Sequence, residues 1–255
     1  QLPYATRQSV TEKEYRVIKG PEDAVQAVKE HVNNSVDVIK IVAFGERMGL
    51  STAEMKAIVN TAHDHGLKVT AHSTGGKSLA DAIDAGVDGI EHAYYLHDTL
   101  LTKMAKRGIY MVPTDPSFNS IIKTQESMQQ TKHDTTAIRS ELKPLSDRLV
   151  RARKAGVMIV AGSDAYFELA GSRGDAAKET IAAYVEEGLS VEEALQAATI
   201  NAAKAIGQKD QLGAIKVGAK ADIVIFNGNL KTVFSTALFD VNMVIKGGKI
   251  IYSRN

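Results

Sequence analysis

The chain has 255 residues, of which 44% are hydrophobic and 24% charged, an ordinary globular composition that can fill one large core. Lys and Arg (31) nearly balance Asp and Glu (30) and are scattered along the chain, so nucleic acid is not an expected partner and a small-molecule substrate is. The absence of cysteine excludes disulfides and thiolate metal sites, which leaves His, Asp, Glu or a modified Lys as candidate metal ligands.

No apolar run is long enough to span a membrane, and the first ten residues, QLPYATRQSV, have no signal-peptide core. A processed protein would also lack such a core. The sequence therefore predicts a soluble protein without a membrane partner, and it leaves the cellular location unknown.

Up to about residue 211, predicted helices and strands alternate. The predicted strands are residues 36–43, 67–72, 89–92, 109–113 and 157–162. The predicted helices are one that opens at Pro21 and others over residues 51–66, 77–84, 98–106, 136–154 (with a break or kink at Pro144), 174–187 and 191–206. Residues 1–20 and 114–134 are polar and poorly patterned. Short connections between the elements favour right-handed βαβ units in a parallel sheet or barrel.

The pattern changes from residue 212 onward. Short β runs at residues 222–226, 241–246 and 249–252 are separated by glycine, and Lys246-Gly247-Gly248-Lys249 is typical of a two-residue hairpin. We therefore expect two domains, 1–211 and 212–255, the second of which is a small β element.

Lys40 lies inside the β-branched run of the first predicted strand. A short β-branched run ended by glycine fits a strand covered on both faces, where an unpaired ammonium would be costly and burial would favour the neutral amine. A neutral lysine amine can react with carbon dioxide to give a carbamate, which is a carboxylate-like metal bridge. The alternative is a lysine whose stem is buried and whose ammonium reaches solvent.

Three further polar residues interrupt or follow predicted strands, namely His72, His92 and Asp164. In α/β barrels the carboxyl ends of the strands build the active site. Two imidazoles, a carboxylate and a carbamate suit Zn²⁺ or a similar ion, and they could hold two ions roughly 3.5–4 Å apart that activate one water. Taken singly, each histidine could be a hydrogen-bonded core residue and Asp164 a turn or helix cap.

The sequence also contains a His-x-His pair, His63 and His65, with a spacing that binds metals when it ends a strand. Here the pair falls in the last turn of a predicted helix, before Gly66. Imidazolium groups complement the C-terminal end of a helix. We therefore expect a structural role for this pair and no metal.

Four segments carry a resemblance to a known family: VIKIVAFG, KVTAHS, GIEHA and AGSDA. In this order and spacing they resemble the metal-dependent amidohydrolase superfamily. The segment ALQAATINAAKAIGQKDQLGAIKVGAKADIVIF is similar to the closing part of those enzymes. The nearest branch carries a carboxylated lysine on strand four and includes prolidase-like Xaa-Pro and Xaa-Arg dipeptidases, ochratoxin-type amidases and imidazolonepropionase-like proteins.

This resemblance implies an α/β fold, a (β/α)8 TIM barrel of amidohydrolase type to which this chain supplies strands 4–8, plus the C-terminal strands of a small β-sandwich. It also implies that Lys40 is the carboxylated bridge, that His72 and His92 are metal ligands, and that Asp164 is both ligand and catalytic proton shuttle. Two divalent ions, expected to be Zn²⁺, would occupy the complete site.

The chain departs from the family in having no His-x-His on a first barrel strand, because its first strand already matches the fourth. We therefore expect the functional particle to include an N-terminal segment, from a longer parent chain or a second polypeptide, that completes the barrel. A homo-oligomer is also expected.

The expected activity is hydrolysis of an amide bond in a dipeptide or N-acyl amino acid by metal-activated water. Tyr94 and Tyr95, just after His92, are candidate substrate contacts or ordinary loop aromatics. The alternatives are a lactonase or organophosphate esterase with the same site, and a non-catalytic half-barrel subunit.

Overall fold

The computed structural model describes residues 15–43, 49–165 and 172–254. Residues 1–14 of the expected irregular start lie outside this range, as do Phe44 and Gly45 at the end of the first strand motif. Contacts divide the chain into two units, Gln1–Ile90 and Glu91–Asn255, with the boundary inside strand β3. The division at residue 211 stays a prediction from the sequence. Among the described residues, no helix is long and apolar enough to cross a membrane.

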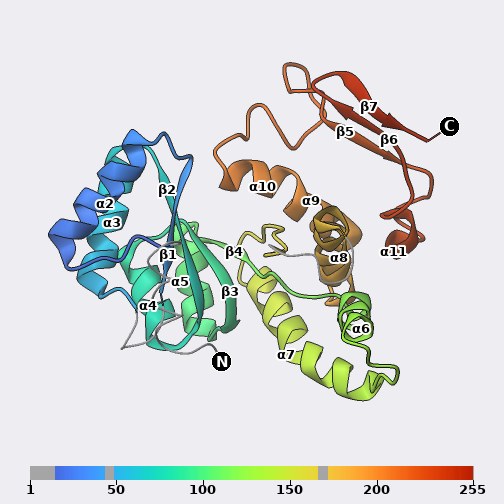
Figure 1. Ribbon diagram of the computed structural model, residues 1–255, viewed down its shortest axis with the longest axis horizontal. Helices are drawn as coiled ribbons and strands as arrows, with labels where there is room; N and C mark the ends of the chain where they lie inside the picture. Colours follow the sequence, from blue (N-terminus) through green and yellow to red (C-terminus); the bar gives the residue numbers. More distant parts are fainter. Residues whose placement is uncertain (1–14, 44–48, 166–171, 255) are drawn as a thin grey trace. The chain divides into compact units, whose positions relative to one another are not determined.

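The first unit alternates helices and strands as predicted (Figure 1). Its elements are α2 (Pro21–Asn33), β1 (Val38–Val42), α3 (Thr52–Asp64), β2 (Lys68–Gly75), α4 (Gly76–Ala85) and the start of β3 (Gly89–Tyr95). Helix α3 begins at a capping box, in which the Ser51 side chain accepts from the Glu54 N–H and the Glu54 carboxylate accepts from the Ser51 N–H at 2.7 Å.

Strands β1 and β2 pair in parallel, with Val38 opposite Lys68 and Val42 opposite His72. Side chains alternate between the two faces of such a pair. One face is apolar and buried, with Ile39 and Ile41 at 6% and 5% exposure, and α3 and α4 pack against β2. The other face carries more polar side chains and is less buried along β1. The prediction of a strand covered on both faces is therefore wrong for β1 as the structure describes it.

The second unit holds the rest of the α/β part. Its elements are the end of β3, α5 (Asp98–Arg107), β4 (Tyr110–Val112), α6 (Phe118–Ser127), α7 (Thr135–Lys154), α8 (Arg173–Glu186), α9 (Val191–Ala198) and α10 (Ile200–Ala205). Strands β1 to β4 form one sheet in that order. The expected fifth strand contributes a single parallel bridge, Met111 to Ile159, with a Met111 N–H to Met158 carbonyl bond of 2.9 Å.

Two helix predictions need correction. The segment 114–134, expected to be irregular, contains α6, which is capped by Ser117 and has no fully buried residue. Pro144 lies inside α7 without breaking it, and the alternative of a kink stays a prediction. The helix expected over 191–206 is split at Thr199, whose φ of −124° and ψ of −89° are not helical.

A three-stranded antiparallel sheet closes the chain. Its strands are β5 (Ile223–Phe226), β6 (Val241–Lys246) and β7 (Lys249–Ser253), and the short helix α11 (Phe234–Ala237), which the sequence did not predict, precedes β6. The β6–β7 hairpin turns at Gly247 and Gly248, both with positive φ, as the sequence predicted.

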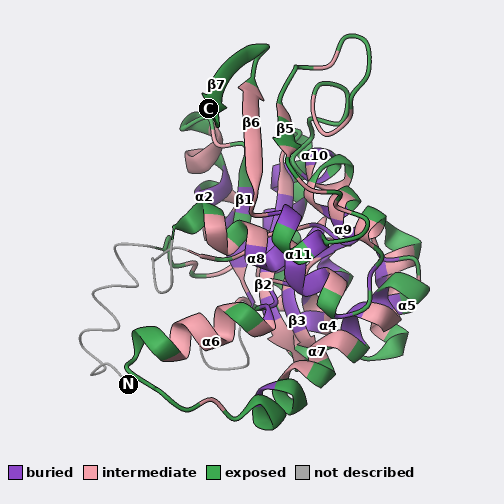
Figure 2. Ribbon diagram, turned by 90° about the vertical axis from the view of Figure 1, so that its right-hand side faces the viewer, coloured by how far each residue is buried: buried purple, intermediate pink, exposed green. Residues whose placement is uncertain are grey.

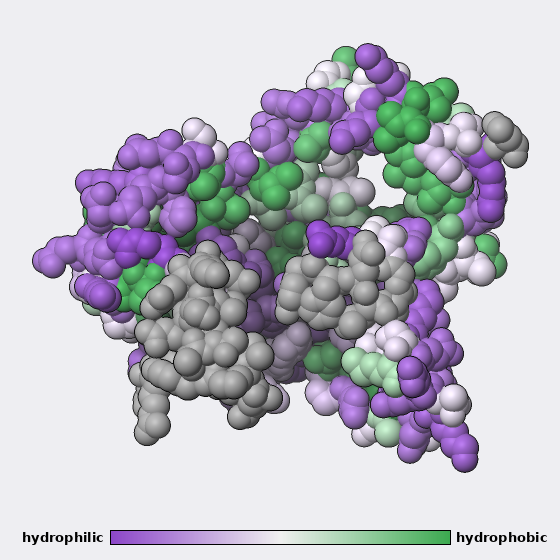
Figure 3. Space-filling view, in the orientation of Figure 1, coloured by the Kyte–Doolittle hydropathy of each residue, from purple (hydrophilic) through white to green (hydrophobic). Residues whose placement is uncertain are grey.

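The small sheet buries little of its own apolar surface. Every residue of β7 is exposed (Figure 2), including Ile250 and Ile251 at 61% each. In the space-filling view, hydrophobic side chains gather over these strands (Figure 3). A sheet this small needs a covered hydrophobic face for stability, and here β7 is exposed and β6 is only partly buried.

Candidate active site

In the first unit, Lys40 and His72 project from the same face of the β1–β2 pair. Lys40 is opposite Thr70 and Val42 is opposite His72, so the two candidates are two positions apart on neighbouring strands. Lys40 is exposed, which removes burial as the reason for a neutral amine. His72 is partly buried, and its Nε2 atom is inaccessible to solvent. Strand alternation alone places these two side chains together.

In the second unit, His92 lies on β3 and is 4% exposed. Its Nδ1 atom is 2.7 Å from the Oγ1 atom of Thr114, which follows β4. The same Thr114 hydroxyl donates to the carbonyl oxygen of Pro113 at 2.6 Å. Thr114 therefore touches a predicted ligand, and sequence reasoning missed it.

Asp164 follows the bridge segment 157–162 and is exposed. Two residues before it, Gly162 passes close to β4, where a Cβ atom on this glycine would lie 2.6 Å from Cγ1 of Val112. Such a distance is a steric clash, so a glycine is needed for the chain to pass β4 and reach Asp164.

Left-handed backbone marks the candidate residues of this unit. His92 (φ 71°), Ala93 (51°), Thr114 (59°) and Asp164 (52°) all have positive φ, which is uncommon outside glycine. Each such residue costs on the order of 1–3 kcal/mol and persists only where surrounding contacts impose it. Residues of this kind concentrate at functional sites, and here they lie within β3, directly after β4 and directly after the segment 157–162.

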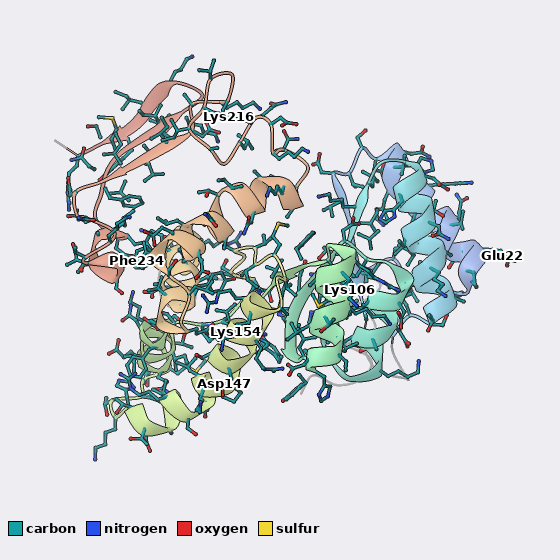
Figure 4. The ribbon with its side chains drawn as sticks, turned by 180° about the vertical axis from the view of Figure 1, so that it is seen from behind. Glu22, Lys106, Asp147, Lys154, Lys216 and Phe234 are labelled. Atoms are coloured by element: carbon teal, nitrogen blue, oxygen red, sulfur yellow. The ribbon has the colours of Figure 1, made fainter. Side chains whose placement is uncertain are left out.

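A buried ionic group lies behind His92. Arg148 of α7 has 0% exposure and donates both to the His92 carbonyl oxygen and to the Asp115 carboxylate, which is also 0% exposed. Its neighbour Asp147, labelled in Figure 4, is largely exposed on the same helix. The guanidinium thus ties the middle of β3 to Asp115, the residue that follows Thr114.

Glu187, just after α8, completes this group and is 4% exposed. Burial, followed by the neighbouring Asp115 carboxylate, raises the pKa of Glu187 to about 10. Burial also raises the pKa of Asp115, against the opposing effect of the Arg148 guanidinium. At this pKa Glu187 holds a proton at neutral pH and so adds no second negative charge beside Asp115.

The two candidate substrate tyrosines differ in their surroundings. The Tyr94 ring lies 5.6 Å from the His92 ring, and the Arg148 guanidinium lies 5.4 Å from its centroid. Tyr95 is 74% exposed. Their contact with substrate stays a prediction, and Tyr94 also supports His92.

The His-x-His pair lies where the sequence placed it, at the end of α3. His63 Nε2 is 2.9 Å from the Asp88 carboxylate, which also accepts the Val69 N–H at 2.8 Å. His65 Nδ1 is 2.8 Å from the Thr61 carbonyl oxygen. These contacts join the helix end to the start of β2, which is a structural role.

Within the described ranges, no group of three or more His, Cys, Asp or Glu side chains could by itself hold a metal ion. The donor chemistry of the candidates nevertheless fits a divalent cation, because imidazole nitrogen and carboxylate oxygen are its usual ligands. His92 also has the outer contact to Nδ1 that metal-binding histidines commonly make.

Parallel strands that alternate with helices and carry polar candidate residues define an α/β protein. The sequence matches the amidohydrolase family over residues 5–251, and the chain belongs to this family. The resemblance drawn from the four sequence segments is thereby confirmed.

Solved structures agree in fold. A Xaa-Pro dipeptidase with bound methionine in its active site is 29% identical, with a TM-score of 0.76, and the match covers 93% of this chain and 60% of that one. The ochratoxinase of A. niger is 26% identical, with a TM-score of 0.74, over 94% of this chain and 56% of that one. The α/β barrel class predicted from the sequence is confirmed.

Among curated relatives, the imidazolonepropionase of Shewanella oneidensis is 26% identical over 237 residues, which is 88% of this chain and 50% of that protein. This chain spans about half the length of the curated relatives that it matches.

Proposed function

We propose that this chain is part of a divalent-metal hydrolase that cleaves an amide bond in a small molecule, with a dipeptide or an N-acyl amino acid as substrate and zinc as the metal. The observation that carries the proposal is the family match over residues 5–251. The likeness to a Xaa-Pro dipeptidase and to an ochratoxinase, both above 25% identity, favours the substrate class.

The residues that would hold two metal ions are Lys40 as its carbamate, His72, His92 and Asp164. To form the carbamate, Lys40 would lose its ammonium proton and its amine nitrogen would then join carbon dioxide with release of a second proton, which would give an anionic ligand for the ions. The exposed face of β1 leaves Lys40 accessible for this reaction. When bound, the ions would supply Lewis-acid polarisation of the carbonyl and activation of a water molecule.

Asp164 would accept the proton of the attacking water and pass it to the leaving amine. Its exposure and its left-handed backbone support this role, because a carboxylate held at a fixed angle after a strand segment can reach a substrate. Tyr94 and Tyr95 would contact the substrate near this point.

We also propose that the functional particle contains an N-terminal segment, from the same parent chain or a second polypeptide, carrying the His-x-His and the early strands. The exposed apolar side chains of β7 and the less buried face of β1 support the proposal. A particle built from residues 1–255 alone that unfolded cooperatively, bound two metals and hydrolysed amides would overturn it.

Asp164→Asn in the assembled protein tests the proposed activity. The amide keeps the shape of the carboxylate but cannot accept a proton, so we expect kcat to fall by about 10²–10⁴-fold with little change in stability. Asp210→Asn, at another exposed carboxylate, is the matched control and should keep normal turnover. Near-normal kcat in the Asp164 variant would exclude it as the proton shuttle.

Two measurements decide between the candidate functions. They are an assay against dipeptides, N-acyl amino acids, lactones and phosphotriesters, and an analysis of the bound metal. Preferential turnover of dipeptides and N-acyl amino acids supports the proposal, whereas preference for lactones or phosphotriesters would reassign the substrate class. A particle that retains no metal and hydrolyses none of these compounds would be a non-catalytic subunit. If the mass of the metal-loaded protein showed that Lys40 is unmodified, the proposal of two metal ions bridged by its carbamate would be wrong.

A further inference from the structure

The hydroxyl of Thr114 has a single hydrogen, and its two short contacts determine where that hydrogen lies. The carbonyl oxygen of Pro113, 2.6 Å away, can only accept a hydrogen bond, so the Thr114 hydroxyl donates to it. Towards the Nδ1 atom of His92, 2.7 Å away, the same oxygen must then act as the acceptor.

This direction fixes the proton on the His92 ring. An oxygen that accepts from Nδ1 requires a hydrogen on Nδ1, and a neutral imidazole carries only one N–H. The lone pair of the neutral ring therefore lies on Nε2. For a histidine in water the proton moves between both nitrogens, so this contact selects one tautomer.

We propose that Thr114 is a positioning residue that holds His92 in the Nδ1–H tautomer and sets the plane of its ring, so that Nε2 is the metal-binding atom. The metal part of this inference rests on the proposed function, whereas the tautomer does not. Outer hydrogen bonds of this kind orient metal-binding histidines and raise their affinity for the ion.

The surroundings make Thr114 a fixed acceptor. Its backbone is left-handed, with φ of 59°, and Asp115, the next residue, is tied by Arg148 to the carbonyl oxygen of His92. The Tyr94 hydroxyl lies 3.5 Å from the same Thr114 oxygen, within reach of its second lone pair. The ring and the main chain of His92 are thus held from the same segment.

The tautomer can be measured without metal. In the assembled, metal-free protein labelled with ¹⁵N-histidine, at a pH about 2 units above the ordinary histidine pKa, protonated and unprotonated ring nitrogens give separate resonances. His92→Gln assigns the His92 signals by their loss. We expect wild type and Thr114→Ser to show Nδ1–H, and Thr114→Val to lose this preference.

Zinc affinity is the second readout, measured by competition with a chelator. Thr114→Val keeps the shape and β-branching of the side chain but cannot accept the bond, so we expect zinc affinity to fall about 10–100-fold, with Thr114→Ser close to wild type. If the valine variant fails to fold, Thr114→Ala takes its place.

The two readouts separate the possible failures. A wild-type His92 that carries its proton on Nε2, or a valine variant with an unchanged tautomer, would overturn the proposal for Thr114. An altered tautomer with unchanged zinc affinity would overturn its role towards the metal. If wild type itself binds no zinc while the tautomer responds as expected, the proposed function fails and the tautomer assignment stands.

Discussion

The two pairs of candidate ligands are held in different ways. Lys40 and His72 lie on regular, hydrogen-bonded strands, and alternation along β1 and β2 places them on one face. His92 and Asp164 lie on left-handed backbone, and His92 is supported by a buried ionic group. The first pair depends on local strand geometry, whereas His92 depends on contacts between residues far apart in the sequence.

This difference predicts where substitutions are most damaging. A buried charge is tolerated only with its partner, so removing one member of the group behind His92 leaves another uncompensated. On the β1–β2 face, single substitutions leave the ladder and the helix-covered core intact. The free energy of unfolding should therefore respond strongly to substitutions in the buried group of Arg148, Asp115 and Glu187. It should respond weakly to substitutions at His63 and His65, where the end of α3 contacts the start of β2.

The largest expected effect on stability is that of Arg148→Met. This change leaves the Asp115 carboxylate buried without its cation and releases the His92 carbonyl oxygen, so we expect a loss of about 3–5 kcal/mol in the free energy of unfolding by denaturant. Arg151→Met, which breaks an exposed ion pair with Asp98 on the same helix, is the control and should cost about 0–1 kcal/mol. Equal losses in the two variants would contradict a special role for the buried group.

A second test uses the proton on Glu187. Its folded pKa is about 10 against an ordinary value of 4.5, so between these values the folded state binds a proton that the unfolded state does not. The stability that the neutral acid contributes is complete below pH 4.5 and is lost as the pH rises towards 10, by at most about 1.4 kcal/mol per pH unit.

Glu187→Gln should remove this loss, because the amide is neutral at every pH. Denaturant titrations at about pH 5.5, 7 and 8.5 should show the variant gaining on wild type as the pH rises. The exposed Glu141→Gln should follow wild type throughout. Parallel curves for wild type and Glu187→Gln would show that Glu187 is ionised in the folded protein.

The smallest effects are expected at the His-x-His pair. His63→Asn and His65→Asn remove contacts at the end of α3, which on exposed positions are worth about 0–1 kcal/mol. Metal content of the assembled protein should not change in either variant. Loss of metal from one of them would mean that this pair, rather than a segment outside the chain, supplies ligands.

Regular periodicity made much of the fold predictable. Some local sequence patterns strongly favour one structure. Examples are the capping box at Ser51, the alternation of helices and parallel strands, and the hairpin at Gly247 and Gly248. The two predictions that failed concern elements without a decisive local signal. Helix α6 has no fully buried residue, and the break at Thr199 falls within a sequence whose apolar pattern continues through it.

The candidate site was predictable only in part. His72, His92 and Asp164 could be proposed because polar residues interrupt or follow apolar strands. Thr114 could not, since a threonine after a proline carries no mark of the histidine 22 residues earlier to which it bonds. The protonation of Glu187 could not be predicted either, because it depends on burial in the fold and on Asp115, which is distant in the sequence.

The close approach of Gly162 to Val112 bears on how this site can be engineered. A library that varies the residues before Asp164 would lose most of its folded members at Gly162, since any side chain there meets Val112 within 2.6 Å. Ser163 already carries a side chain and is partly buried, so it is the better position to randomise. A second library in which Val112 is replaced by Ala or Gly would remove this clash and allow small residues at position 162. Such variants could change the backbone conformation that orients Asp164.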